Sequence, residues 1–280
     1  MSNVSNNSLL TDSVEVAPNR LIGVFYFTHG IVFLIPLVLC LPVMAQKEQR
    51  KHSCYKIMLV MTTLDIINLC TSSILSGYYS YNGIQYCCGH ETSMRIIGRF
   101  ALGFFFMYTS TCVLLAFNRF IDFYSDDLTE RLFGKRRTWY WSVVPLLYGA
   151  YFFTPWSTTI VYNSQFDIWI FTQDETGKKG VIIHTINNVM TAALLFVLYS
   201  LICYQLRRYF SIQPTTQSND AAARRISSMQ KQVIVQSVMI CSLTVISCLA
   251  YVIVQYTDNF PPALYKTTQI IWQIMHGTSP

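Results

Sequence analysis

Apolar residues are grouped along the chain in long blocks, which polar segments separate. A block of roughly 20 residues lets an α-helix cross a hydrocarbon core of about 30 Å. The pattern predicts seven membrane-spanning helices, at about 21–45, 55–79, 94–118, 139–162, 180–205, 232–256 and 263–280. The last block runs to the C-terminus at the lower edge of spanning length, so we expect a truncated seventh helix. Residues 1–20 form a polar N-terminal tail, and residues 21–280 form one domain.

The composition agrees with this pattern, because 52% of the residues are hydrophobic and only 12% are charged. Soluble globular chains usually carry about 25% charged residues, so we expect an all-α membrane protein. The sequence contains no glycine-rich phosphate loop, no G-x-S-x-G motif and no zinc-type spacing of Cys and His. The spans also lack the internal repeat that is typical of transporters. These features argue against an enzyme, a coupled transporter and a cofactor or metal site, and no nucleic-acid partner is expected.

Lys and Arg residues are concentrated in the first, third and fifth connections between the spans. Short connections that are rich in these residues stay on the cytoplasmic side. We therefore expect a multi-pass protein of the plasma membrane whose N-terminus lies outside the cell. The tail carries the glycosylation pattern N-x-[ST] at Asn3 and Asn6, which fits this orientation. Chance is the alternative, because Ser and Asn are abundant in the tail.

Two of the nine cysteines, Cys87 and Cys88, are expected outside the membrane. The long outer connection, about 163–179, contains no cysteine, so a disulfide from the third helix to this loop cannot form. The adjacent pair could join another chain, form a strained vicinal bond or remain as thiols.

Several polar residues are expected at membrane depth, where their cost makes each a candidate functional residue. Helical rise places Asp65 about 14 Å from the inner end of the second span, and Tyr108 and His276 at a similar depth. We hypothesise a buried polar cluster of Asp65, Tyr108, His276 and Ser279 that links the second, third and seventh helices. The alternative is that Asp65 is neutral and hydrogen-bonded within its own helix, to a group such as the Met61 carbonyl.

An arginine, Arg119, stands at the predicted inner end of the third span in LLAFNRFIDF, on the same helix face as Tyr108. It could be a snorkelling anchor that reaches water or a signalling residue. The fifth connection carries Arg224, Arg225 and Lys231 on a stretch that is expected to extend the sixth helix inward. These residues could serve as a positive-inside signal near anionic lipid or could dock a cytoplasmic partner.

Aromatic and polar residues near the outer ends of the spans are candidates for a ligand pocket. They are Phe104, Phe105, Tyr251, Gln255, Tyr256 and Trp272. Such a lining would suit a small, mostly apolar or aromatic molecule. The alternative is that these aromatics form an interfacial belt or core packing. The outer half of the third helix has no acidic residue to anchor an amine.

Five short motifs carry a resemblance to a known family. LAFNRF resembles the Asn-Arg version of the Asp-Arg-Tyr motif in nematode serpentine chemoreceptors, which are seven-helix G-protein-coupled receptors. The other segments are similar to the class T branch of that family. They are SCYKIM (53–58) leading to Asp65 in TTLDII, LFGKRRTW (132–139), PLLYGAY (145–151) and HGTSP (276–280).

The resemblance implies a rhodopsin-like bundle and assigns roles to matching positions. Arg119 would match the arginine that reaches the G-protein α-subunit, with Asn118 in place of the acidic neighbour. Asp65 would match the second-helix aspartate of an ion and water cluster. Pro280 resembles a seventh-helix proline, and the sequence stops there, before the Tyr that follows in family members.

The function that the resemblance implies is a chemosensory receptor, in the cilia of sensory neurons, which binds an environmental small molecule and activates a heterotrimeric G protein. One alternative is a truncated, non-signalling receptor or a dimerisation partner. The other is a channel-like sensory protein, which would require the opposite orientation.

Overall fold

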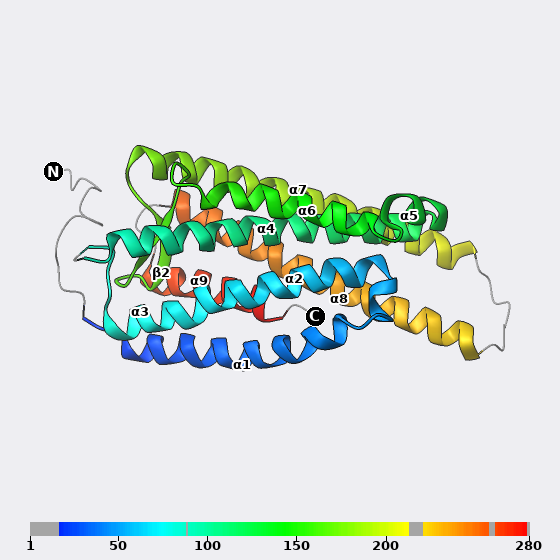
Figure 1. The fold of residues 1–280 in the computed structure, drawn as a ribbon, viewed down its shortest axis with the longest axis horizontal. Helices are drawn as coiled ribbons and strands as arrows, with labels where there is room; N and C mark the ends of the chain where they lie inside the picture. The colour runs from blue at the N-terminus through cyan, green and yellow to red at the C-terminus, as the bar shows by residue number, and fades with distance from the viewer. Residues whose placement is uncertain (1–16, 88, 213–220, 258–260, 279–280) are drawn as a thin grey trace.

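The computed structural model describes residues 17–87, 89–212, 221–257 and 261–278, apart from the side chains of 206–212, 221–234 and 236–237. In this part of the chain the fold is a mostly helical bundle with one short hairpin (Figure 1). The helices are α1 (Arg20–Met44), α2 (Ser53–Leu69), α3 (Ser76–Asn82), α4 (Glu91–Tyr124), α5 (Asp126–Phe133), α6 (Arg137–Ala150), α7 (Glu175–Ile212), α8 (Ala221–Tyr256) and α9 (Pro262–Gly277).

Five helical segments of the described chain are long and apolar enough to cross a membrane. They are Arg20–Met44, Ser53–Asn82, Glu91–Tyr124, Glu175–Gln205 and Val238–Tyr256. The second of these contains α2 and α3, which a π-helical segment, Cys70–Leu75, joins into one element. The shorter helices α6 and α9 complete the bundle.

Large apolar side chains face outward, whereas polar side chains are enclosed. Leu147 is 67% exposed and Phe196 is 74% exposed, while Asp65, Asn68 and Gln273 are fully buried. Water would not stabilise such an arrangement, but lipid does, because apolar surface costs nothing there and polar groups must find partners inside.

The predicted fourth span, 139–162, is wrong in its second half. Helix α6 and a short 3-10 turn end at Phe153, and Thr154 takes an extended conformation with ψ 147°. Pro155 explains this end, because a residue that precedes proline is disfavoured in the α-region. The chain then enters strand β1 (Ile160–Asn163), which the sequence analysis did not predict.

The third span is longer than predicted, because α4 continues to Tyr124. Arg119 therefore lies more than one turn before the end of its helix. Ser125 ends α4 and caps α5, since its side chain accepts a hydrogen bond from the amide of Leu128. Helix α4 is central to the bundle and packs against α2, α6, α7 and α8.

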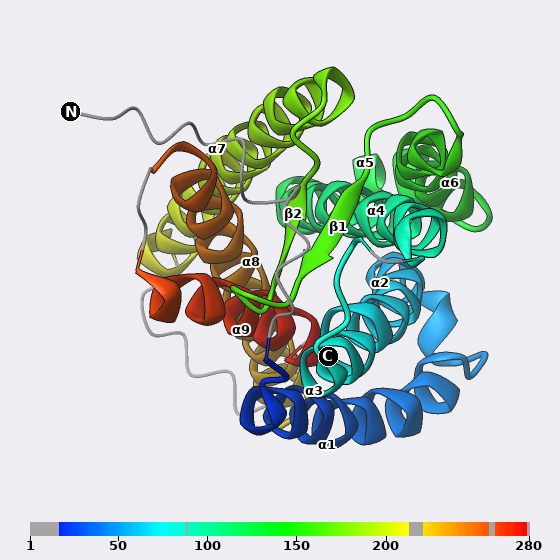
Figure 2. The same ribbon diagram turned by 90° about the vertical axis from the view of Figure 1, so that its left-hand side faces the viewer.

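Strands β1 and β2 (Ile168–Phe171) form an antiparallel hairpin that crosses one end of the bundle (Figure 2). We call this the hairpin end and the opposite end, where α5 lies, the basic end. Asn163 shapes the turn, because its Oδ1 accepts hydrogen bonds from the amides of Gln165 and Phe166. Asp167 completes the turn in the left-handed region, with φ 56°.

Asp167 is fully buried and joins three helices to the hairpin. Its carboxylate accepts hydrogen bonds from Asn19 Nδ2 at 2.8 Å and Ser80 Oγ at 2.5 Å, and Lys266 Nζ lies 3.2 Å away. The Tyr26 hydroxyl donates to the Asp167 carbonyl oxygen at 3.1 Å. We call these five residues the Asp167 clasp. The clasp holds the hairpin against α1, α3 and α9 without a covalent bond.

Replacement of Asp167 by Asn should lower the unfolding free energy by about 2–3 kcal/mol, because the variant leaves Lys266 without a counter-ion and weakens two hydrogen bonds. The thermal midpoint of the purified protein measures this loss. Asp126→Asn is the matched control, since Asp126 is exposed at the basic end. An equal midpoint for both variants would contradict the role of the clasp.

Candidate functional site

A cavity of about 410 Å³ lies beneath the hairpin, between α4, α7, α8 and α9. Aromatic and aliphatic side chains make up most of its wall. The lining residues are Leu102, Phe105, Ile160, Trp169, Ile170, Phe171, Thr172, Gln173, Lys178, Val181, His184, Tyr251, Val254, Gln255, Tyr265 and Trp272. A pocket of this size and composition is typical of small-molecule sites.

Of the residues predicted to line a ligand pocket, Phe105, Tyr251, Gln255 and Trp272 do so. Phe104 does not. Its ring packs against Phe153 at 5.2 Å, on the side of α4 that faces α6, because successive helical residues point about 100° apart.

Tyr256 is also absent from the wall of this cavity and is 62% exposed. Its neighbour Gln255 lines the cavity, so the same helical rotation explains both corrections.

The hairpin and His184 are the parts of the wall that the sequence analysis missed. A signal for the hairpin exists, because TTIVYN and DIWIF are rich in β-branched and aromatic residues and flank a short polar turn. His184 gives no such signal, since a single histidine in an apolar helix does not reveal its partners.

The mouth of the cavity is fastened near the start of α7. Asp174 Oδ1 accepts hydrogen bonds from Thr172 Oγ1 and the Gly177 amide, both at 2.7 Å, and Arg95 lies 3.6 Å from Oδ2. Burial alone would raise the pKa of Asp174, but these donors and the arginine lower the pKa below its usual value. Asp174 therefore stays ionised and caps α7.

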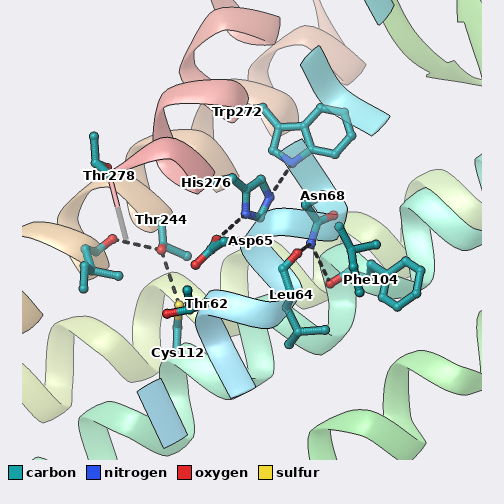
Figure 3. Close-up of polar contacts among 12 residues, drawn as sticks. Thr62, Leu64, Asp65, Asn68, Phe104, Cys112, Thr244, Trp272, His276 and Thr278 are labelled. Atoms are coloured by element: carbon teal, nitrogen blue, oxygen red, sulfur yellow. Dashed lines mark hydrogen bonds and ion pairs between the residues drawn. The ribbon is translucent and has the colours of Figure 1, made fainter. Parts of the chain in front are cut away.

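Below the cavity, Asp65 and His276 lie together (Figure 3), and Tyr108 packs against His276. His276 Nδ1 lies 2.7 Å from Asp65 Oδ1, and the Tyr108 ring packs edge-on against the imidazole at 4.4 Å. All three side chains are fully buried. Asp65 thus contacts α9, beyond its own helix. Ser279, the fourth predicted member, lies outside the described residues.

The proton of His276 can be placed from its partners. The indole nitrogen of Trp272 lies 2.9 Å from His276 Nε2. An indole N–H only donates, so Nε2 must accept, and the neutral imidazole carries its proton on Nδ1. Nδ1–H therefore donates to Asp65. The result is a directed relay, from Trp272 in the cavity wall through His276 to Asp65 on α2.

Near this relay, the second span is hydrogen-bonded to α9 on one side and to α4 on the other. The Ser72 carbonyl, which lies in the π-helical segment, accepts hydrogen bonds from Gln269 Nε2 and Gln273 Nε2 on α9, both at 2.8 Å. On the other side, Asn68 Nδ2 donates to the Phe104 carbonyl of α4 at 3.3 Å. We call Asp65, Tyr108 and His276 with these bonds the core polar cluster.

At the basic end, Arg119 is 12% exposed and pairs with Asp122 one turn further along α4, at 3.2 Å. Asn118 is fully buried, and its Nδ2 donates to Ser53 Oγ at 2.9 Å. In this conformation Asn118 therefore joins α4 to the first turn of α2 and does not reach the surface.

Other predicted site residues fall in parts that the structure does not describe. Arg224, Arg225 and Lys231 lie on the N-terminal part of α8, where only the backbone is described. Asn3, Asn6 and Cys88 lie outside the described residues, so neither the glycosylation sites nor the cysteine pair is placed.

The arrangement of helices is that of rhodopsin. The structure of squid rhodopsin superposes with a TM-score of 0.74, over 96% of this chain and 86% of that chain, at 11% identity. The fold is therefore a seven-helix bundle like that of rhodopsin, as predicted.

The sequence defines the family more closely. The model of the serpentine type 7TM GPCR chemoreceptor family Srt matches residues 6–280, and the chain belongs to this family. Serpentine receptor class T-55 of Caenorhabditis elegans is 21% identical over 264 residues, which are 91% of this chain and 68% of that protein. The resemblance drawn from LAFNRF and the other motifs is confirmed. This is a family of receptors of the G-protein-coupled type.

A double-mutant cycle measures the bond between α2 and α9. Asp65→Leu and His276→Leu should each destabilise the protein, because each removes one partner of a buried hydrogen bond. The double variant should lose about 1–3 kcal/mol less than the sum of the two, as measured by unfolding in detergent.

His29→Leu provides the matched control for this cycle. His29 lies on α1, where its ring packs against Phe33 at 4.6 Å. The loss of unfolding free energy caused by His29→Leu should add to the loss caused by Asp65→Leu. Additivity between Asp65→Leu and His276→Leu would show that the pair is not coupled.

Proposed function

We propose that the protein is a chemosensory receptor that binds a small molecule in the cavity under the hairpin and activates a heterotrimeric G protein at the basic end. The observation that carries this proposal is the relay. Trp272 lines the cavity, and its N–H is bonded to His276, which in turn donates to Asp65. A ligand against Trp272 therefore lies one side chain away from the core polar cluster.

The relay gives a physical basis for a two-state response. A ligand that contacts the Trp272 ring favours some orientations of the indole over others. If the favoured orientation breaks the bond to His276, the contacts of α9 with α2 change as well. A single hydrogen bond contributes about 0.5–1.5 kcal/mol, and 1.4 kcal/mol is a tenfold change in an equilibrium. The loss of one or two bonds is therefore enough to shift a bundle between two populated states.

At the basic end, Arg119 is the residue that would contact the G protein. In this conformation the guanidinium is mostly buried and paired with Asp122. Separation of the inner helix ends would expose Arg119 to a partner. Arg224, Arg225 and Lys231 would add positive charge to the same face, and Asn118 would hold α4 against α2 through Ser53.

The proposal includes an orientation. The N-terminal tail and the hairpin end lie outside the cell, and the basic end lies in the cytoplasm, as the positive-inside rule favours. The protein is placed in the plasma membrane, and the family resemblance suggests the cilia of sensory neurons.

Arg119→Ala should reduce G-protein activation at least about tenfold, while ligand binding changes little, because Arg119 lies at the opposite end from the cavity. Nucleotide exchange on a purified heterotrimer, with the receptor in liposomes, measures activation. Arg131→Ala is the matched control, since Arg131 lies on α5 and is 72% exposed. If nucleotide exchange is unchanged with Arg119→Ala, Arg119 is only a snorkelling anchor and not a residue that contacts the G protein.

The orientation predicts that Asn3 and Asn6 are glycosylated when the protein is expressed in animal cells. Asn3→Gln and Asn6→Gln should each increase electrophoretic mobility by one glycan, and the double variant should equal the deglycosylated protein. A tag at residue 1 should be labelled on intact cells. If both sites are unmodified and the tag is labelled only after permeabilisation, the orientation is the opposite one and the receptor proposal is contradicted.

A further inference from the structure

Three aromatic residues of the cavity wall, Trp169, Tyr251 and Trp272, direct their polar atoms away from the cavity. Trp169 Nε1 donates to Ser76 Oγ at 2.8 Å, and the Tyr251 hydroxyl donates to Gln269 Oε1 at 3.2 Å. The Trp272 N–H is bonded to His276. Each of these donors is satisfied behind the wall, so the three residues present mainly apolar ring surface to a ligand.

A pair of polar side chains, His184 and Gln255, interrupts this apolar wall. Gln255 Nε2 lies 2.8 Å from His184 Nδ1, and Gln255 Oε1 accepts from Thr185 Oγ1 at 3.2 Å. With the amide held in this way, Nδ1 accepts a hydrogen bond, and the neutral imidazole carries its proton on Nε2. The second amide hydrogen of Gln255 is a further donor.

Among the residues that the structure describes, no acceptor is bonded to the His184 Nε2–H, so this donor is available to a ligand. Four aromatic rings pack around the imidazole, those of Phe105 at 5.2 Å, Phe171 at 5.4 Å, Tyr251 at 5.9 Å and Phe106 at 6.1 Å. Rings of this kind offer no strong acceptor. Asn188 Nδ2 lies 3.5 Å from His184 Nε2, but an amide nitrogen is itself a donor.

Charge on the wall also restricts the ligand. Among the residues that the structure describes, Lys178 is the one charged residue that lines the cavity, and its Nζ is paired with Glu175 at 2.7 Å. No carboxylate of this described part of the chain lines the cavity. A cationic ligand would lose hydration without gaining a counter-ion, which costs free energy.

We infer that the cavity takes a neutral, largely apolar molecule with one hydrogen-bond-accepting oxygen, a carbonyl or a hydroxyl, which the His184–Gln255 pair binds. At about 30 Å³ for each water-sized group, the cavity holds a ligand of roughly a dozen non-hydrogen atoms. The inference rests on the proposed function only in taking this cavity as the ligand site.

Four probes with one carbon skeleton test this inference: acetophenone, 1-phenylethanol, ethylbenzene and 1-phenylethylamine. The dissociation constant of each follows from its concentration-dependent shift of the thermal midpoint of the purified full chain in detergent. Acetophenone and 1-phenylethanol should bind about fivefold to tenfold more tightly than ethylbenzene, and the protonated amine should bind more weakly than ethylbenzene.

Two variants test whether the His184–Gln255 pair causes the preference for a probe that carries an oxygen. In His184→Phe and Gln255→Met, acetophenone should bind no more than about twofold more tightly than ethylbenzene, while ethylbenzene binding persists. Gln205→Leu, at the other end of α7, is the matched control and should keep the wild-type order. If His184→Phe fails to fold, Gln255→Met alone decides.

Three results would overturn the inference: no binding of any probe at millimolar concentration, an amine that binds as tightly as the ketone, or an order that both variants leave unchanged. The measurement needs no G protein. Failure of G-protein activation would therefore leave this result standing, and failure of the probe order would leave the receptor proposal standing.

Discussion

The bond between His276 and Asp65 is the interaction on which the position of α9 depends. Helices in lipid gain little from apolar contact with one another, because lipid chains are as apolar as leucine. Helix α9 is short, and the side that it buries is polar. Gln269, Gln273 and His276 are all fully buried. His276 is hydrogen-bonded to α2, and the two glutamines are bonded to the π-helical segment that follows α2. Polar contacts therefore place this helix more than apolar packing does.

The same contacts make the two ends of the molecule different in kind. The hairpin end is closed by a strand pair, a buried carboxylate and an aromatic wall. The basic end presents positive charge and one mostly buried arginine. In the proposed mechanism, a change that begins at Trp272 reaches the part of the bundle where α2, α4 and α9 are joined by hydrogen bonds. The helices are rigid over their length, so a displacement at the core polar cluster would also move their ends at the basic end.

Sequence reasoning was sufficient wherever one physical rule dominates. Apolar blocks of spanning length predicted the bundle, since lipid imposes that length whatever the neighbours are. Helical rise placed Asp65, Tyr108 and His276 at one depth. Rise does not give rotation about the axis, however, so Phe104 and Phe105 could not be told apart. The end of α6 could have been predicted from Pro155, which was counted as part of a span.

Other features depend on contacts between distant segments, which a single sequence does not reveal. Asp167 meets Lys266 across about a hundred residues of chain, and nothing local marks it as buried. The contact between His184 and Gln255 likewise joins residues that lie far apart in the sequence. The hairpin was missed for a different reason. Strand β1 follows directly from an apolar segment and falls mostly within the predicted fourth span, whereas β2 falls in the predicted outer connection.

The π-helical segment at Cys70–Leu75 has a consequence for how this chain tolerates changes in length. A π-turn accommodates an additional residue in a helix whose two ends keep their places. Deletion of one residue there would restore regular α-helix and keep α3 in its present rotation. If all the residues stayed and formed regular α-helix, α3 would be rotated by about 100° relative to α2. Gly77 would then leave its close contact with the Gly23 carbonyl, and Ser80 would turn away from Asp167. The second span thus has two parts. One part, α2, is oriented toward the membrane core, and the other, α3, toward the hairpin. The single additional residue of the π-turn sets the rotation of α3 relative to α2.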